Sequence, residues 1–167
     1  TRGMIHGTRA VARRMLPRGK GHIINVASTA GKAGLAGGAT YCASKAAVVQ
    51  YTEGAYAELH PKGLDFSVVM PGITRTDLAT GVEDMRGFRS ITPEAVADAI
   101  VSTIAKPRFE VYVPRSARSL MNANRLLSFE TAQRVGTRMG LDRVFLDALA
   151  DPARSGYEAR ATGKADR

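Results

Sequence analysis

Residues 21–48 read GHIINVASTAGKAGLAGGATYCASKAAV, and the pattern changes twice along them. The run at 22–28 is short, apolar and rich in β-branched residues, which predicts a buried strand. A glycine-rich loop follows at 29–40, and over 41–60 apolar side chains recur at helical spacing. The stretch therefore predicts a strand, a loop and a helix in succession.

The chain up to residue 114 continues this alternation. Apolar runs predict two further strands, at 64–70 and 109–113. Helical spacing predicts helices at 3–16 and 92–105, and in the second of these Thr92 followed by proline is a typical helix start. Strands that alternate with helices indicate βαβ units, so we expect an α/β fold around a parallel sheet.

The chain changes character after Pro114. Beyond this proline we expect helices only, broken near Gly140 and Pro152. The sequence therefore predicts two parts, a sheet-containing part over 1–114 and a helical C-terminal extension over 115–167.

The net charge of +9 is unevenly distributed. Residues 1–20 carry +6 and residues 115–167 carry +4, whereas the part between them carries −1. The basic segments lack interleaved aromatic residues and any nucleic-acid motif, so we expect no nucleic-acid partner. Basic, amphipathic C-terminal helices suit either a solvated surface or a weak contact with a membrane surface, and the sequence leaves both open.

Cysteine content and hydropathy favour a cytoplasmic location. Cys42 is the only cysteine, so no internal disulfide can form, and a reducing compartment fits. No apolar run approaches the roughly 18 residues that would span a bilayer. We expect Cys42 to be a small buried helix residue, and we expect no metal site from the three histidines, which are His6, His22 and His60.

Polar and conformationally special residues follow two of the predicted strands. Ser28 ends the first strand, and a Pro-Gly pair at 71–72 with Thr74 and Thr76 follows the second. Ligands in open parallel sheets bind outside the carboxyl ends of the strands. Tyr41 opens the helix between these strands, so we expect three separate segments to meet at one edge of the sheet.

Tyr41 and Lys45 are four residues apart, a spacing that places them on one face of a helix. A free phenol titrates near pH ~10, and a close cation favours its ionised form. A phenol, an ammonium and the Ser28 hydroxyl around one oxygen would suit the interconversion of a carbonyl compound and an alcohol. The hydride must then come from a cofactor, because no side chain supplies one.

These segments resemble the classical short-chain dehydrogenase/reductase family. The stretch quoted above, followed by VVMPGITRTDL, has the family's strand ending in N-x-x-S, its Y-x-x-x-K pair and its PG-x-x-x-T loop in the expected order. Ser28 lies thirteen residues before Tyr41, which is the spacing usual in that family. The resemblance covers residues 1–114 and fades through the C-terminal helices.

The resemblance implies a role for each matching residue. Tyr41 would be the general acid and base, Lys45 would favour its ionised form and hydrogen-bond the nicotinamide ribose, and Ser28 would orient the substrate oxygen. The cofactor would be NAD or NADP, which the sequence does not distinguish. The residues implied to hold its nicotinamide, besides Tyr41 and Lys45, are Pro71, Gly72, Ile73, Thr74 and Thr76. The residues alone also allow a purely structural role for two of these side chains. Ser28 could be a strand-end cap, and Thr76 could be the N-cap of a following turn.

The implied fold is the last three strands of a Rossmann-like, doubly wound parallel sheet with flanking helices. The family's N-terminal glycine-rich cofactor half has no counterpart here, and its catalytic asparagine would fall at or just before Thr1. The strand at 22–28 would then be a bare sheet edge. We therefore expect a fragment of a longer oxidoreductase; the alternative is a truncated, non-enzymatic remnant or subunit that cannot bind a dinucleotide alone.

Substrate and partners follow from two further segments. The loop at 77–90 should form a lid, and its apolar residues favour an apolar alcohol or ketone as the small-molecule substrate; they are Leu78, Val82, Met85 and Phe88. The helix at 41–60 resembles the family's dimerising helix, so we expect a homodimer or a homotetramer.

Overall fold

A three-stranded parallel sheet forms the centre of the molecule. The computed structural model describes residues 1–82, 89–152, 154 and 156. Its strands are β1 (Gly21–Val26), β2 (Leu64–Pro71) and β3 (Glu110–Val113), in the order β1-β2-β3 and all parallel. The expected α/β fold and its three strands are confirmed, with strand ends shifted by one or two residues.

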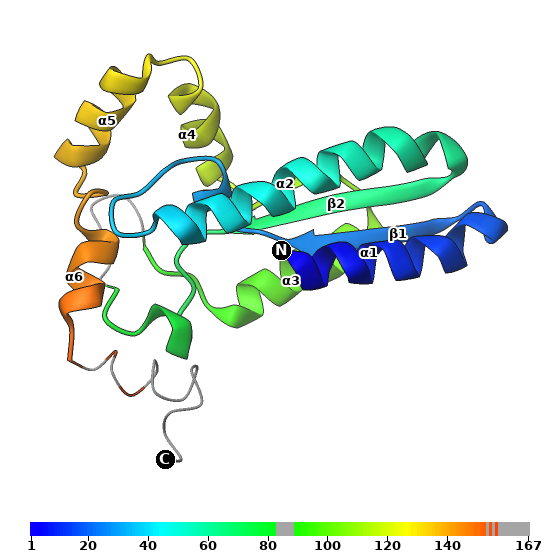
Figure 1. Cartoon of the computed structure of the whole chain (residues 1–167), viewed down its shortest axis with the longest axis horizontal. Coiled ribbons are helices and arrows are strands. Elements are labelled where there is room, and N and C mark those ends of the chain that lie inside the picture. Colours follow the sequence, from blue (N-terminus) through cyan, green and yellow to red (C-terminus); the bar gives the residue numbers. More distant parts are fainter. Residues whose placement is uncertain (83–88, 153, 155, 157–167) are drawn as a thin grey trace.

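Helices cover both faces of this sheet (Figure 1). Helices α1 (Arg2–Met15) and α2 (Ala39–Leu59) pack on one face, and α3 (Pro93–Ala105) packs on the other. The expected helix start at Thr92 is confirmed, because the Thr92 hydroxyl accepts a hydrogen bond from the Ala95 N–H at 3.2 Å.

The central strand β2 is buried on both faces. Phe66, Val68 and Met70 face α1 and α2, whereas Val69 faces α3. A parallel strand covered on both faces is apolar almost throughout, which explains why this segment was recognisable from its composition.

Among the described strands β1 lies at the edge of the sheet, as expected, and the expected burial holds for one of its faces only. Ile23 and Asn25 are buried against the α1–α2 layer, but Val26 points to the other face and is 45% exposed. The reason is that α3 packs mainly on β2 and β3, through Val69 and Val111, and leaves β1 largely open on that face.

Asn25 connects the α1–α2 layer to the sheet. Its Nδ2 donates to the Thr52 hydroxyl of α2 at 3.0 Å, and its Oδ1 accepts from the Thr8 hydroxyl of α1 at 3.3 Å. Thr52 in turn donates to the Val48 carbonyl at 2.7 Å. The three side chains are buried, and they satisfy one another as buried polar groups must. Thr8 of α1 therefore belongs to the core, whereas Val11 of the same helix is 41% exposed.

The C-terminal segment forms three short helices. They are α4 (Ala117–Asn124), α5 (Phe129–Arg138) and α6 (Val144–Ala150). The expected break near Gly140 is confirmed, with a φ of +81° there, and α6 ends shortly before Pro152. A further break at 125–128 was not expected, and Ser128 caps α5 by accepting from the Thr131 N–H at 3.3 Å.

The carboxyl ends of the strands, the start of α2 and the C-terminal helices lie at the same end of the molecule (Figure 1). Within the described residues, no helix has the length and apolar character needed to cross a bilayer. The fold thus brings the segments with polar and reactive residues to one edge of the sheet.

We predict that Asn25→Ala lowers the free energy of unfolding by about 1–3 kcal/mol, because it deprives two buried threonine hydroxyls of their partner. Urea denaturation checks this. The matched control is Asn122→Ala on the exposed surface of α4, which should change stability by less than about 0.5 kcal/mol. Equal stability of the two variants would show that the Asn25 hydrogen bonds do not hold the layers together.

Candidate active site

Tyr41 and Lys45 lie in the first turns of α2 and face the same side. The Lys45 Nζ lies 5.7 Å from the centroid of the Tyr41 ring. Burial lowers the pKa of the Lys45 ammonium, and among the described residues no carboxylate forms an ion pair with it. The geometry therefore leaves a partly buried cation next to a phenol, with its hydrogen-bond donors available to a ligand.

Ser28 lies at the end of β1 and is buried. Its hydroxyl donates to the Pro71 carbonyl at 3.3 Å and accepts from the Ala30 N–H at 3.2 Å. The strand-end cap that the sequence left open is therefore present, at the start of the short 3-10 turn Thr29–Gly31. Within the described residues no hydrogen bond joins Ser28 to Tyr41.

The turn after Ser28 nevertheless packs directly on the Tyr41–Lys45 segment. A Cβ atom at Gly31 would lie 2.9 Å from the backbone carbonyl of Lys45, so only glycine permits this approach. At the other side of the segment, the Thr1 hydroxyl donates to the Ser44 carbonyl at 3.0 Å. Thr1 thus lies beside the turn that carries Tyr41.

The loop after β2 is held by backbone hydrogen bonds. The Gly72 N–H donates to the Val113 carbonyl at 2.8 Å. Ile91 forms a bridge with this loop, donating to the Ile73 carbonyl at 2.8 Å and accepting from the Arg75 N–H at 2.9 Å. The Thr74 hydroxyl donates to the Gly72 carbonyl at 3.2 Å. These bonds give the residues after β2 a defined backbone shape.

Thr76 occupies the N-cap position of a 3-10 turn over Asp77–Ala79, as one reading of the sequence expected. Its hydroxyl makes no cap hydrogen bond there and instead donates to the Thr74 carbonyl at 3.3 Å. Of the expected lid residues, Leu78 is exposed and Val82 is half-buried, whereas Met85 and Phe88 lie outside the described residues.

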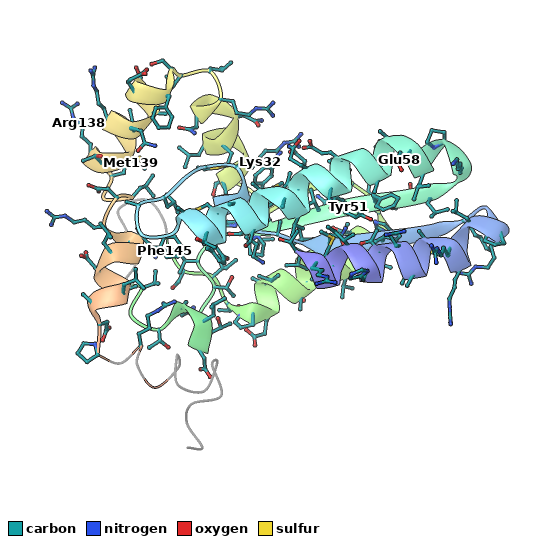
Figure 2. The ribbon with its side chains drawn as sticks, viewed as in Figure 1. Lys32, Tyr51, Glu58, Arg138, Met139 and Phe145 are labelled. Atoms are coloured by element: carbon teal, nitrogen blue, oxygen red, sulfur yellow. The ribbon has the colours of Figure 1, made fainter. Side chains whose placement is uncertain are left out.

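Lys32, labelled in Figure 2, forms an ion-pair cluster that the sequence did not indicate. Its Nζ lies 3.3 Å from Glu53 Oε1 on α2 and 3.0 Å from Glu110 Oε1 on β3. Burial works against the Lys32 ammonium, but hydrogen bonds and charge from Glu110 and Glu53 outweigh it, so the pKa of Lys32 is raised. The cluster ties the glycine-rich loop to α2 and to the sheet. No sequence pattern joins positions so far apart.

Phe145 is a second residue that sequence reasoning missed. Its ring packs against the Tyr41 ring, with centroids 5.8 Å apart and planes tilted by 48°. A Cβ atom at Gly38 would lie 2.9 Å from the Phe145 ring, and one at Gly37 would lie 3.1 Å from Leu146. Figure 2 shows Phe145 between α6 and the start of α2. Helix α6 therefore lies against the segment that carries Tyr41.

Other candidate chemistry gains no support from the described residues. Cys42 is buried in α2 with a free thiol, as expected for a packing residue. Within the described part of the chain, no three His, Cys, Asp or Glu side chains cluster as a metal site would require.

The fold and the site together define a class of protein. A parallel sheet with helices on both faces is the doubly wound α/β architecture, in which ligands bind outside the carboxyl ends of the strands. The sequence profile of the short chain dehydrogenase family matches residues 1–87, which is more than half of the chain. The chain therefore belongs to the short-chain dehydrogenase family.

Individual relatives agree with this assignment. The chain is 38% identical over 109 residues to the ketoacyl reductase HetN of Nostoc sp., covering 64% of this chain and 38% of that protein. It is 33% identical over 145 residues to the probable oxidoreductase EphD of Mycobacterium tuberculosis, covering 75% of this chain and 24% of that protein.

Among solved structures, a short chain dehydrogenase of Burkholderia cenocepacia in complex with NADP superposes with a TM-score of 0.63 at 30% identity. The match covers 78% of this chain and 52% of that structure. The chain thus spans about half of this solved relative and less than half of the two curated relatives.

We predict that Lys32→Met destabilises the protein by about 1–2 kcal/mol at neutral pH, because two partly buried carboxylates lose their cation. Because the pKa of Lys32 is raised in the folded protein, the ion pairs of Lys32 stabilise the fold at every pH below the ordinary lysine pKa of 10.5. This stabilisation is lost as the pH rises through the raised pKa of the folded state. Chemical denaturation at pH 7 and above pH 10.5 measures the difference. The control is Lys62→Met at an exposed position; equal effects of both variants would refute the cluster's contribution.

Proposed function

We propose that the chain carries the catalytic part of an NAD(P)-dependent oxidoreductase that interconverts an apolar ketone and an alcohol, with Tyr41 as general acid and base. The observation that carries this proposal is the Tyr41–Lys45 pair, in which a partly buried ammonium without a carboxylate partner among the described residues lies beside a phenol. Family membership supports oxidoreductase chemistry, and relatives named as ketoacyl reductases support a carbonyl substrate.

The residues present fit the nicotinamide end of such a cofactor. Lys45 has donors available for ribose hydroxyls, and in the described part of the chain the N–H groups of Ile73 and Thr74 have no hydrogen-bond partner. Unpaired N–H groups after a Pro-Gly turn suit the carboxamide oxygen of nicotinamide. Pro71, Gly72 and Thr76 would shape this loop. The solved relative in complex with NADP supports the same choice of cofactor class.

When bound, the nicotinamide supplies a hydride in reduction or accepts one in oxidation. In reduction, the Tyr41 hydroxyl would donate its proton to the carbonyl oxygen, which becomes the hydroxyl oxygen of the alcohol. In oxidation, the Tyr41 oxygen takes the proton back. The Lys45 charge stabilises the phenolate that remains after proton donation.

Ser28 would orient the substrate oxygen. Its hydroxyl now donates to the Pro71 carbonyl at 3.3 Å, which is long for a hydrogen bond between oxygens. Replacing this hydrogen bond by one to a substrate oxygen would therefore cost little free energy. The hydrogen bond from the Ala30 N–H to the Ser28 hydroxyl would keep the side chain in place. The two roles of Ser28, cap and substrate donor, are therefore compatible.

The α1–α2 layer would provide the contact between subunits of a homodimer or homotetramer. A groove of about 320 Å³ lies between these helices. Tyr51 and Glu58 of α2 line it, and Figure 2 shows both along that helix.

The open β1 edge favours the second candidate function, in which the chain acts as a non-catalytic part that pairs with another strand-bearing segment.

We predict that Tyr41→Phe lowers kcat for NAD(P)H-dependent ketone reduction by about 100-fold or more, because it removes the proton donor. The assay uses the protein as isolated from its source, with both cofactors, and follows the loss of reduced nicotinamide absorbance. The matched control is Tyr56→Phe on the same helix, where the ring packs on His60 and Phe109 and should tolerate the change. Unchanged activity of Tyr41→Phe, or an inactive wild type with both cofactors, would refute the proposed function.

A further inference from the structure

Helix α6 packs against the segment that carries Tyr41. It is anchored by Ala148, which is fully buried, and it contacts two loops that follow strands. On one side Phe145 and Leu146 pack on the glycine pair at 37–38. On the other side a Cβ atom at Gly81 would lie 3.3 Å from the Ala148 carbonyl. These contacts fix the helix relative to both loops.

Phe145 is the side chain of α6 whose ring contacts Tyr41. Its ring packs on Tyr41 at 5.8 Å between centroids, and it approaches so closely because Gly38 has no side chain. Both rings are only partly buried, so part of each surface remains accessible to a ligand. A phenyl ring is apolar, rigid and large, so it limits the volume available to a group bound beside the Tyr41 ring.

We infer that Phe145 is a specificity-determining residue, which forms an apolar wall beside Tyr41 and selects carbonyl compounds with a small apolar substituent on that side. The inference rests on the proposed function, since it assigns the substrate class of the same site. Helix α6 lies beyond the residues matched by the family profile, which end at residue 87. The profile match therefore says nothing about this wall, which follows from the structure alone.

Two ketones that differ only beside the carbonyl group test this wall. Acetophenone carries a methyl group there, and isobutyrophenone carries an isopropyl group. We predict that Phe145→Ala raises the ratio of kcat/KM for isobutyrophenone over acetophenone by about 10-fold or more, in line with the discrimination that one or two methylene groups give in an apolar pocket. Phe145→Trp should lower the ratio. The matched control is Phe129→Ala on α5, where the ring is 73% exposed and should leave the ratio unchanged.

A second measurement needs no enzymatic activity. Phe145→Ala should increase the rate at which tetranitromethane nitrates Tyr41 several-fold, as followed by peptide mass spectrometry, because the ring that covers Tyr41 is removed. Phe129→Ala should leave this rate unchanged. An unchanged nitration rate in Phe145→Ala would overturn the inference, because Phe145 would then not cover Tyr41 in solution.

The two measurements separate the failure of this inference from the failure of the proposed function. An active wild type whose substrate ratio is the same in Phe145→Ala overturns the specificity role alone. A wild type that is inactive on both ketones overturns the proposed function, and the specificity role with it, even where nitration increases. A shifted ratio together with faster nitration supports the inference.

Discussion

Burial of the central strand β2 on both faces is the constraint on which the rest of the structure depends. Its apolar side chains face α1 and α2 on one side and α3 on the other, so this one strand joins both layers. The strand ends at Pro71, whose carbonyl accepts hydrogen bonds from Ser28 and Thr29. The same element therefore supports the core and fixes the loop that follows β1. Packing and the candidate site are coupled through it.

Two lysines near the site show how the fold assigns different roles to the same side chain. Lys32 lies between two carboxylates, which raise its pKa and make it a structural cross-link between loop, helix and sheet. Lys45 is partly buried without such a partner among the described residues, and burial lowers its pKa. A cation without a fixed counter-charge can interact with a phenol and with a ligand. This difference in electrostatic surroundings is the reason to assign a catalytic role to Lys45 and a structural role to Lys32.

The local elements were predictable because their signals are local. The three strands, the helix start at Thr92 and the Tyr41–Lys45 pairing on one helix face follow from composition and spacing within short windows. The sequence-based predictions failed where the burial or the end of an element depends on other elements that pack against it. Val26 is exposed because α3 covers the other strands, and the break at 125–128 depends on Ser128 capping rather than on glycine or proline.

The sequence by itself determined the α/β alternation, the family resemblance and the candidate residues Ser28, Tyr41 and Lys45. Periodicity and motif spacing are properties of nearby residues, so one chain suffices to read them. Only the tertiary structure decided what surrounds these residues. The Lys32 cluster and the Phe145 ring come from segments far apart in the chain, and they reach the site because β2 and α6 bring distant positions into contact. Such contacts leave no periodic trace in the sequence, because they depend on how whole elements pack.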